Sequence, residues 1–421
     1  MNNELHEKAQ LARTAARNLA HLSTEVKNKV LQSIAVALGT NQAEILTANA
    51  VDYHDAQATG MEEALLDRLR LDGARLNAMA ADVQAIAALP DPVGEVFDMR
   101  TLPNGLQLGK KRVPLGVIAA IYESRPNVTI DIACLCLKSG NAVILRGGKE
   151  TLRSNKALAD TIRKALAEAG APVEAVQLIE DTDRALVGEL LKMRNLIDLV
   201  VPRGGAGLIG YVRDNAAMPV IAGGIGVCHT FVDNTALLNK AVDIVYNAKV
   251  QRPTVCNALD TILVHKDVAD AFLPLMATAL AKAGVELHCD DTSLEILQKQ
   301  SGLKLKPAVP DDWGKEFLAL IAAIKVVDSL DEALDHIDCY GSGHTEAIIT
   351  EDYTSAMRFL NEVDSAAVLV NASTRFTDGG QFGLGAEVGI STQKMHARGP
   401  MGLKEITSYK WICMGCGQVR P

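Results

Sequence analysis

Apolar residues recur every three or four positions through the first 89 residues of the chain. The stretch 65–89, LLDRLRLDGARLNAMAADVQAIAAL, shows this spacing most clearly, and ATGME at 58–62 is a turn signal. Such spacing places the apolar side chains on one face of a helix. The pattern therefore predicts a helical opening segment over residues 4–89.

After LPDPVG at 89–94 the pattern changes to short apolar runs that alternate with helical spacing. Short apolar runs are typical of buried strands, and their alternation with helices is typical of parallel βαβ units. The chain is therefore predicted to be an α/β protein with a doubly wound parallel sheet. The runs lie at 113–122, 127–140, 141–146, 151–170, 173–179, 184–192 and 196–201.

A second alternating series begins near residue 225 and predicts a second doubly wound α/β domain. Residues 290–316 interrupt this series, because they are rich in charge and in turn formers and show little periodicity. We expect them to form a surface excursion of the second domain. The alternating runs lie at 227–233, 236–250, 259–265, 267–284, 316–327 and 366–371.

A β-hairpin is expected at 99–112, MRTLPNGLQLGKKR, where PNG supplies the turn. The tail 403–421 contains EITSYKWI, which has the texture of a further strand of this hairpin. The two segments are therefore expected to form one small β structure.

Composition restricts the partners more than the fold. The chain has 421 residues, of which 48% are apolar and 22% charged, so it can bury a large core in two or three domains. A net charge of −9, a pI near 5.6 and only 4% aromatics argue against nucleic acid. Continuous apolar runs are too short to span a membrane. Eight irregularly spaced cysteines and a charged amphipathic N-terminus predict a cytoplasmic protein with reduced thiols.

The segment GGAGLIG carries a G-x-G-x-x-G pattern at Gly205, Gly207 and Gly210, after an apolar run and before a helical one. Glycines in such a turn let backbone N–H groups approach a phosphate at a helix N-terminus. A dinucleotide fingerprint and a nucleotide contact of another geometry both remain open for Gly204 and Gly205. Arg203 is either a phosphate ligand or a solvated surface arginine.

Arg146 and Lys149 in LRGGKE follow the apolar run NAVIL, where a parallel sheet presents its ligand crevice. Two cations there suit the 2′-phosphate of a ribose, which favours NADPH over NADH. The alternative is an ordinary polar turn.

Cys256 lies in VQRPTVCNALDT, after a polar turn and directly before an apolar run. Arg252 lies four residues earlier, and this setting makes a thiol accessible and stabilises its thiolate, as a nucleophile requires. A buried apolar role is the alternative, and it is the role expected of Cys134, Cys136, Cys228, Cys289 and Cys339. Cys413 and Cys416 form a C-x-x-C without a second pair, so no metal site is expected.

Four segments together resemble the aldehyde dehydrogenase superfamily, and within it the reductases that act on the acyl phosphate of proline biosynthesis. They occur in the same order as in that superfamily and are distributed over nearly the whole chain. The segments are YESRPNVTID at 122–131, VQRPTVCNALDT at 250–261, LDEALDHIDCYGSGHTEAI at 330–348 and FGLGAEVGISTQKMHARGPMGL at 382–403.

The resemblance implies an aldehyde dehydrogenase-like fold with two doubly wound α/β domains, for cofactor and catalysis, and a small β oligomerisation flap. It makes Cys256 the nucleophile, Asn127 a holder of the oxyanion and Glu316 a contact of the nicotinamide ribose. Ala222 stands where aldehyde-oxidising members carry a glutamate that activates water. The implied ranges are 1–98, 113–224 and 385–402 for the NADP-binding domain, 225–384 for the catalytic domain, and 99–112 with 403–421 for the flap.

The implied function is NADPH-dependent reduction of L-glutamyl 5-phosphate to L-glutamate 5-semialdehyde, with phosphate release, through a thioester on Cys256. Arg125 and Arg252 are expected either to bind the substrate's anionic groups or only to brace their loops. His344 is either a proton donor or a structural residue. The resemblance further implies a homodimer or larger homo-oligomer, with substrate channelled from glutamate 5-kinase. The alternatives are a coenzyme A-dependent acylating aldehyde dehydrogenase and a catalytically silent binding protein.

Overall fold

The computed structural model describes residues 3–420, apart from the side chains of Asn3 and Ala64. These residues form two compact units. The first unit comprises residues up to 223, 383–389 and 401–420, and the second comprises 224–382 and 390–400.

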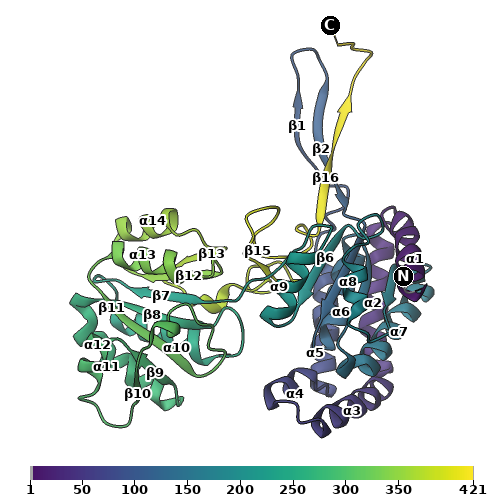
Figure 1. The fold of residues 1–421 in the computed structure, drawn as a ribbon. Helices are drawn as coiled ribbons and strands as arrows, with labels where there is room; N and C mark the ends of the chain where they lie inside the picture. The colour runs from purple at the N-terminus through teal and green to yellow at the C-terminus, as the bar shows by residue number, and fades with distance from the viewer. Residues whose placement is uncertain (1–2, 421) are drawn as a thin grey trace. The chain divides into compact units, whose positions relative to one another are not determined.

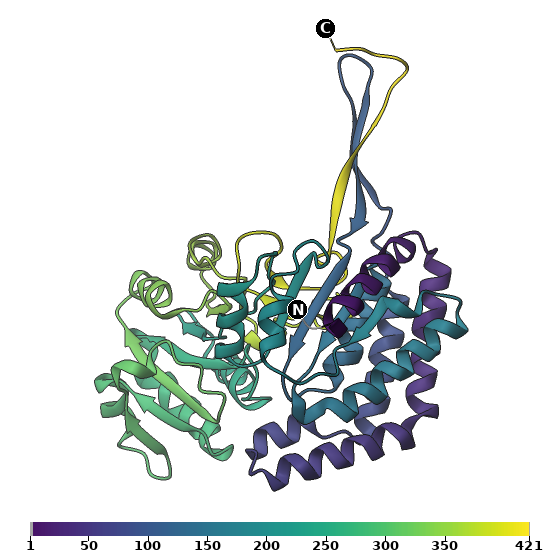
Figure 2. The ribbon, with the colours of Figure 1, turned by 45° about the vertical axis from the view of Figure 1, so that its right-hand side comes forward.

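The predicted helical opening segment is confirmed. Leu31, Ile34 and Leu38 of α2 are buried at helical spacing, and Asp72 caps α5 by accepting a hydrogen bond from Arg75 N at 2.8 Å. Helix α2 packs on α5, and Figure 2 shows these purple and blue helices lying beside the teal elements of the same unit. The helices are α1 (Asn3–Leu19), α2 (Thr24–Thr40), α3 (Gln42–Ala58), α4 (Glu63–Leu69) and α5 (Gly73–Ala88).

The first unit contains a parallel sheet, as the alternating pattern predicts. Its strand order is β5-β4-β3-β6. Every residue of β3 and β4 is buried, as expected of parallel strands covered on both faces. The elements are β3 (Val117–Tyr122), α6 (Asn127–Lys138), β4 (Ala142–Arg146), η1 (Lys149–Thr151), α7 (Leu152–Glu168), η2 (Val173–Ala175), β5 (Val176–Leu178), α8 (Ala185–Leu190), β6 (Leu199–Arg203) and α9 (Ala206–Asn215).

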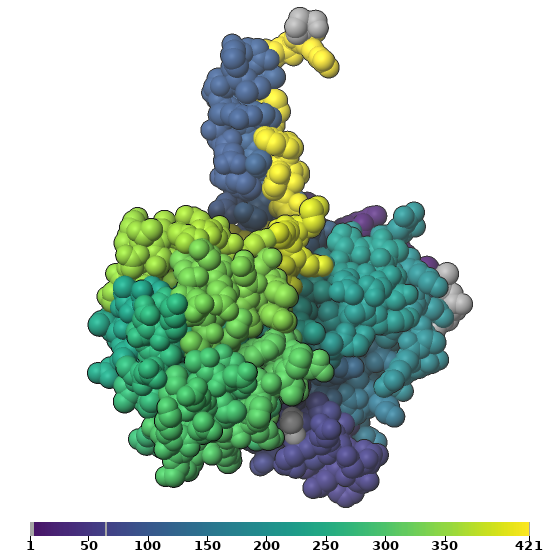
Figure 3. Space-filling model, turned by 60° about the vertical axis from the view of Figure 1, so that its left-hand side comes forward, coloured from purple at the N-terminus to yellow at the C-terminus, as the bar shows by residue number. Residues whose placement is uncertain are grey.

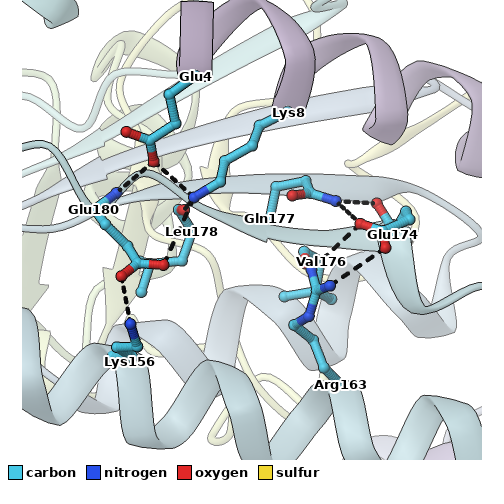
Figure 4. A network of polar contacts seen from close by, with 9 residues as sticks. All are labelled: Glu4, Lys8, Lys156, Arg163, Glu174, Val176, Gln177, Leu178 and Glu180. Carbon is cyan, nitrogen blue, oxygen red and sulfur yellow. Dashed lines mark hydrogen bonds and ion pairs between the residues drawn. The ribbon is translucent and has the colours of Figure 1, made fainter.

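Strand β5 lies at the edge of this sheet, and cationic side chains cover its carbonyl groups (Figure 4). Lys8 Nζ donates to the carbonyl of Leu178 at 2.6 Å, and Arg163 Nη1 donates to that of Val176 at 3.0 Å. Glu4 and Glu174 hold these cations in turn. Unpaired strand edges attract other chains, so this charged cover protects the edge and ties α1 and α7 to it.

The hairpin is confirmed as β1 (Val96–Thr101) and β2 (Gln107–Pro114), and the tail adds β16 (Thr407–Met414) to give the order β1-β2-β16. Figure 1 shows these strands as a ribbon, and in Figure 3 the yellow tail lies along the blue hairpin. Lys110 Nζ lies 4.7 Å from the ring centroid of Tyr409 and 5.1 Å from that of Trp411. Cation–π contacts therefore link β2 to β16.

The second unit is built on a parallel sheet with the order β10-β9-β11-β8-β7-β12-β13. Its elements are β7 (Cys228–Val232), α10 (Leu238–Val250), β8 (Leu259–His265), α11 (Lys266–Lys282), β9 (Glu286–Cys289), α12 (Asp291–Leu297), β10 (Lys304–Pro307), η3 (Pro310–Asp312), β11 (Ile321–Val327), α13 (Leu330–Tyr340), β12 (Thr345–Ile349), α14 (Tyr353–Glu362), β13 (Ala367–Val370), η4 (Thr374–Phe376), β14 (Ile390–Ser391) and β15 (Gly399–Pro400).

Successive residues of β8 enter the cores on opposite faces of this sheet. Ile262 packs with Phe272 of α11, whereas Leu263 packs with Phe359 of α14. The period-two alternation of a strand thus separates one layer of α10, α11 and α12 from another of α13 and α14. The predicted doubly wound architecture is confirmed for this unit.

Three expectations differ from the structure. Residues 290–316 are not only a surface excursion, because Leu297 of α12 is fully buried and β10 extends the sheet. Residues 390–400, expected with the cofactor domain, belong to the second unit, where Arg398 pairs with Asp364 at 2.6 Å. Cys339 is exposed on α13 and does not fill a core.

Among residues 3–420, no helix is both long and apolar enough to cross a membrane.

Candidate active site

The turn between α10 and β8 carries Cys256, which is partly exposed. Its backbone packs against Gly226 so closely that a Cβ atom there would lie 1.9 Å from the carbonyl oxygen of Cys256. The same oxygen accepts a hydrogen bond from Cys228 Sγ at 3.2 Å. Burial raises the pKa of the Cys228 thiol well above its ordinary value, which keeps this donor protonated. The backbone of Cys256 is therefore held from within the second unit.

Asn257 fixes the other side of this turn. Its Nδ2 donates to the carbonyl of Thr377 at 2.8 Å, and its own carbonyl accepts from Thr374 Oγ1 at 2.7 Å. Asn257, Thr374 and Thr377 are all buried. The segment around η4 is thus attached to the residue that directly follows Cys256.

Lys249 links the two elements on either side of the turn. It is fully buried, and its Nζ donates to the carbonyl of Leu259 at 2.6 Å and lies 3.5 Å from Asp260 Oδ1. Burial raises the pKa of Asp260 to about 6 and lowers that of Lys249. This contact joins the end of α10 to the start of β8, on either side of Cys256.

Glu316 also belongs to this centre of the second unit. Its Oε1 accepts a hydrogen bond from Gly226 N at 3.1 Å, so its carboxylate borders the segment on which Cys256 packs. The assignment of Glu316 to the nicotinamide ribose stays a prediction.

His344 lies nearby but is 1% exposed, with its Nδ1 2.8 Å from Thr345 Oγ1 and 3.9 Å from Cys228 Sγ. Burial lowers its pKa to about 4, so the imidazole is neutral near pH 7. This setting favours the structural alternative over a proton donor.

Two arginines are close to the turn that carries Cys256, which is called the nucleophile turn below after the role predicted for Cys256. Arg252 is exposed on the turn itself. Arg375 of η4 donates from Nε to Gln251 Oε1 at 2.7 Å, although 124 residues separate the two. Sequence reasoning missed Arg375, because no local pattern shows that η4 docks here.

The first unit contains a cavity of about 510 Å³ at the carboxyl ends of β3 and β4 and beside α8 and α9. Ligand crevices of doubly wound sheets lie at this edge, and the volume suits a nucleoside. Its walls are mainly apolar and carry two arginines. The lining residues are Ile121, Tyr122, Glu123, Arg146, Arg184, Ala185, Val187, Leu208 and Tyr211. A hollow of about 590 Å³ beside Lys282 and Lys299 in the second unit contains none of the predicted site residues.

Arg146 lines this cavity, but it is only 8% exposed, and its guanidinium group is bonded to neighbouring backbone carbonyls. Its Nη atoms donate to the carbonyls of Gly147 at 3.0 Å and Thr182 at 2.9 Å. Its buried Nε has no hydrogen-bond partner within residues 3–420 and is available to a ligand oxygen.

Arg184 is the second cation of the cavity, and no local pattern in the sequence indicated it. Its side chain is exposed and forms no hydrogen bond or ion pair with the described residues. Burial, and to a smaller extent the charge of Arg184, lowers the pKa of Arg146, so the two guanidinium groups are close. Lys149 lies in η1 and is not one of the lining residues.

The glycine pattern follows β6 and opens α9, as predicted, with Gly205 as the N-cap. The N–H of Gly205 donates to Glu123 Oε2 at 3.0 Å, so a carboxylate occupies the place that a phosphate takes in a standard dinucleotide fingerprint. A Cβ on Gly204 would meet the same carboxylate at 2.4 Å, whereas Gly207 and Gly210 have open space. This geometry favours a nucleotide contact other than the standard fingerprint.

A strained loop delivers Arg125 and Asn127. Ser124 has φ 45°, in the left-handed region that non-glycine residues rarely adopt, and Glu150 Oε1 accepts from both its N and its Oγ at 2.8 Å. Glu150, which follows the carboxyl end of β4, therefore holds this loop in place. Arg125, which is partly exposed, follows Ser124 directly.

Asn127 begins α6, and its Nδ2 donates to Asp131 Oδ2 at 2.9 Å. Burial raises the pKa of Asp131 to about 7, while the bond from Asn127 and the charge of Arg203 act in the opposite direction. Arg203 therefore lies close enough to Asp131 to stabilise its charge. The phosphate role predicted for Arg203 stays a prediction.

Comparison with known proteins identifies the family. The family model described as "Aldehyde dehydrogenase family" matches residues 2–296. The chain belongs to the aldehyde dehydrogenase family. A gamma-glutamyl phosphate reductase of Dehalococcoides mccartyi is 67% identical over 99% of this chain and 98% of its own. The corresponding protein of Chloroflexus aurantiacus is 59% identical over 97% of both chains.

A solved structure agrees. The gamma-glutamyl phosphate reductase of Thermotoga maritima has a TM-score of 0.96 and 49% identity, with complete coverage of both chains. The expected aldehyde dehydrogenase-like fold is thus confirmed, and the chain is an oxidoreductase of a family that uses nicotinamide cofactors. Within the described part of the chain, no group of three His, Cys, Asp or Glu residues is arranged to hold a metal ion.

Gly226→Ala should displace the turn of this dehydrogenase that carries Cys256, because the new methyl group would overlap the Cys256 carbonyl. A shift of about 1 Å at a reacting group costs on the order of a hundredfold in turnover. Reductase turnover and the alkylation rate of the Cys256 peptide, followed by mass spectrometry, measure the effect. Gly39→Ala, at an exposed position of α2 where a Cβ atom meets open space, is the matched control, and equal behaviour of the two variants contradicts the close-packing argument.

Asp131→Asn should make stability less dependent on pH. Folding raises the pKa of Asp131 from 3.8 to about 7, so its contribution is complete below pH 3.8 and is lost as pH rises through 7. Asparagine does not ionise and can still accept from Asn127. Between pH 5 and pH 8.5 the wild-type melting temperature should fall on the order of 2–6 °C further than that of the variant, allowing for the partial exposure of Asp131. Asp214→Asn, at an exposed carboxylate, serves as control, and parallel pH profiles for Asp131→Asn and wild type contradict the prediction.

Proposed function

We propose that this protein reduces L-glutamyl 5-phosphate to L-glutamate 5-semialdehyde in proline biosynthesis, with NADPH as reductant and release of phosphate. The observation that carries the proposal is the fixed turn of Cys256, in a chain 67% identical to a gamma-glutamyl phosphate reductase. Gly226, Cys228 and Asn257 hold the backbone of this turn and leave Cys256 partly exposed, as a nucleophile requires.

The first step joins the Cys256 sulfur to the γ-carbonyl carbon of the substrate. The thiolate attacks, and the N–H of Cys256 with the amide of Asn127 stabilises the oxyanion, at ~3 kcal/mol for each such donor. The carbon–oxygen bond to phosphate then breaks, and phosphate leaves with the bonding electrons. Arg125 and Arg252 are the proposed partners of the substrate's anionic groups.

The second step reduces the resulting thioester. NADPH, when bound, supplies the hydride to the thioester carbon. The thiohemiacetal oxyanion then collapses, the carbon–sulfur bond breaks, and Cys256 is regenerated as thiolate. Ala222 carries no carboxylate to activate water, so the thioester persists until it is reduced.

The cavity of the first unit fits the adenosine end of such a cofactor. Apolar walls suit the base, and Arg146 and Arg184 provide positive charge for a 2′-phosphate. Gly204, Gly205, Arg203 and Lys149 remain proposed contacts at the rim of this region, and Glu316 is the proposed contact of the nicotinamide ribose.

The β1-β2-β16 ribbon is proposed to pair subunits in a homodimer or larger oligomer. Its exposed side chains include Val96, Met99, Tyr409, Trp411 and Met414, which is an apolar surface of the kind that subunits cover. A cytoplasmic location and channelling from glutamate 5-kinase remain predictions. The coenzyme A-dependent alternative requires coenzyme A as acyl acceptor, and the silent alternative requires that Cys256 be dispensable.

The reverse reaction tests the proposal. With semialdehyde and NADP, NADPH formation should require inorganic phosphate, since phosphate must attack the thioester, and Cys256→Ser should abolish it. Substrate without NADPH should leave an acyl adduct on the Cys256 peptide, visible by mass spectrometry. Phosphate-independent formation of NADPH, or formation that depends on coenzyme A, would exclude the acyl-phosphate reaction.

Arg184→Ala should weaken NADPH more than NADH, because only NADPH carries the 2′-phosphate. Loss of one charge-assisted contact should raise the KM for NADPH on the order of 10- to 100-fold and leave the KM for NADH nearly unchanged. Steady-state kinetics with both cofactors measure this difference. Arg194→Ala, at an exposed arginine of the same unit, is the control. Equal effects on the two cofactors would contradict the role of Arg184.

A further inference from the structure

We propose that Arg375 of η4 forms, together with Arg252, the site that binds the phosphoryl group of the substrate beside Cys256. This inference rests on the proposed function and assigns a substrate-binding role to a residue outside the motifs that define the nucleophile. All of the contacts that support it lie within the second unit.

The first support is the attachment of η4 to both ends of the nucleophile turn. Before Cys256, Gln251 accepts from Arg375 Nε at 2.7 Å. After Cys256, Asn257 is bonded to Thr374 at 2.7 Å and to Thr377 at 2.8 Å. Arg375 thus belongs to a short segment that is bonded on both of its sides to Asn257, while the Arg375 side chain itself reaches Gln251 on the other side of Cys256.

The second support is the rigidity of this segment. Ser373, Thr374 and Thr377 are buried, and Ser373 caps η4 by accepting from Arg375 N at 3.3 Å. A guanidinium on a fixed backbone loses little conformational freedom when it binds an anion. Among the described residues, Gln251 is the one hydrogen-bond partner of the Arg375 side chain, so its two Nη groups remain for an acceptor.

The third support is the charge around Arg375. Burial lowers its pKa, Asp378 raises it, Arg252 lowers it further, and Cys256 raises it. The two arginines are therefore near one another and near the thiol. Asp378 neutralises only part of this charge, because its Oδ1 also accepts from the N–H groups of Gly380 and Gln381 at 2.9 and 3.2 Å. Two neighbouring cations repel each other, and a dianionic phosphate between them relieves that repulsion.

The distance along the substrate selects the phosphoryl group rather than the α-carboxylate. The phosphorus is two bonds from the carbonyl carbon that Cys256 attacks, whereas the carboxylate lies beyond three further carbons. Cations fixed to the turn of Cys256 therefore face the leaving group. They also stabilise the charge that phosphate gains as it departs.

The reverse reaction distinguishes binding of the phosphoryl group from binding of the α-carboxylate, because phosphate and semialdehyde are added independently. Arg375→Gln should raise the KM for inorganic phosphate on the order of 10- to 100-fold and change the KM for semialdehyde by less than about twofold. Arg375→Lys keeps the charge but not the planar fork or the Nε bond, so it should recover part of the phosphate affinity. Gln251→Ala removes only the anchor of Nε and should have a smaller effect in the same direction.

Arg358→Gln is the matched control, because Arg358 is an exposed arginine of α14 that pairs with Glu362 and Asp331. Melting temperatures show whether each variant is folded, and Arg375→Lys serves as the test if Arg375→Gln does not fold. A rise in the KM for semialdehyde alone would assign the pair to the α-carboxylate and overturn the proposal, as would unchanged constants. Wild-type enzyme that ignores phosphate would instead overturn the proposed function itself.

Discussion

The close approach of Gly226 to the carbonyl of Cys256 is the packing constraint on which the geometry of the candidate site in the second unit depends. Only glycine permits this approach, because a Cβ atom at residue 226 would lie 1.9 Å from that oxygen. Cys228 and Asn257 add directed hydrogen bonds on two sides. Every one of these restraints acts on backbone atoms or on Asn257, so the turn is held in place while Cys256 stays partly exposed. A nucleophile needs both conditions, since a buried thiol ionises poorly and a mobile one is misaligned.

In the first unit, too, the residues that hold the backbone differ from those proposed to act on the substrate. Glu150 holds Ser124 in a left-handed conformation and so fixes the loop before Asn127, while Asp131 orients the amide of Asn127 itself. Glu150 accepts two hydrogen bonds from Ser124 in this strained conformation, and these bonds help to hold it. The side chains proposed to act on the substrate are thus oriented by carboxylates that need not contact it.

Local patterns in the sequence predicted the elements but not the contacts between distant segments. Apolar spacing predicted α1 to α5, and PNG predicted the hairpin, because each depends on neighbouring residues alone. Cys256 and Asn127 were predicted as site residues from the motif of Cys256 and from the family resemblance, and their catalytic roles stay predictions. Glu150, Arg184 and Arg375 were missed, because their relevance arises only when η1, α8 and η4 pack beside other segments. The prediction from periodicity was wrong for residues 290–316, because α12 is short and β10 is an edge strand with little burial. Cys339 shows that residue type alone does not place a side chain in a core.

The carboxylates near Cys256 support the proposal that reduction, and not hydrolysis, completes the reaction. Glu316 accepts the N–H of Gly226, and Asp260 accepts from Phe317 N at 3.1 Å and lies beside Lys249. A general base must be able to take a proton from water next to the thioester. Asp260 is buried with its cation, and rotating Glu316 toward water would leave the N–H of Gly226 without this acceptor. Both carboxylates are therefore bonded to residues that support the turn, and under the proposed function neither is set up to activate water against the thioester.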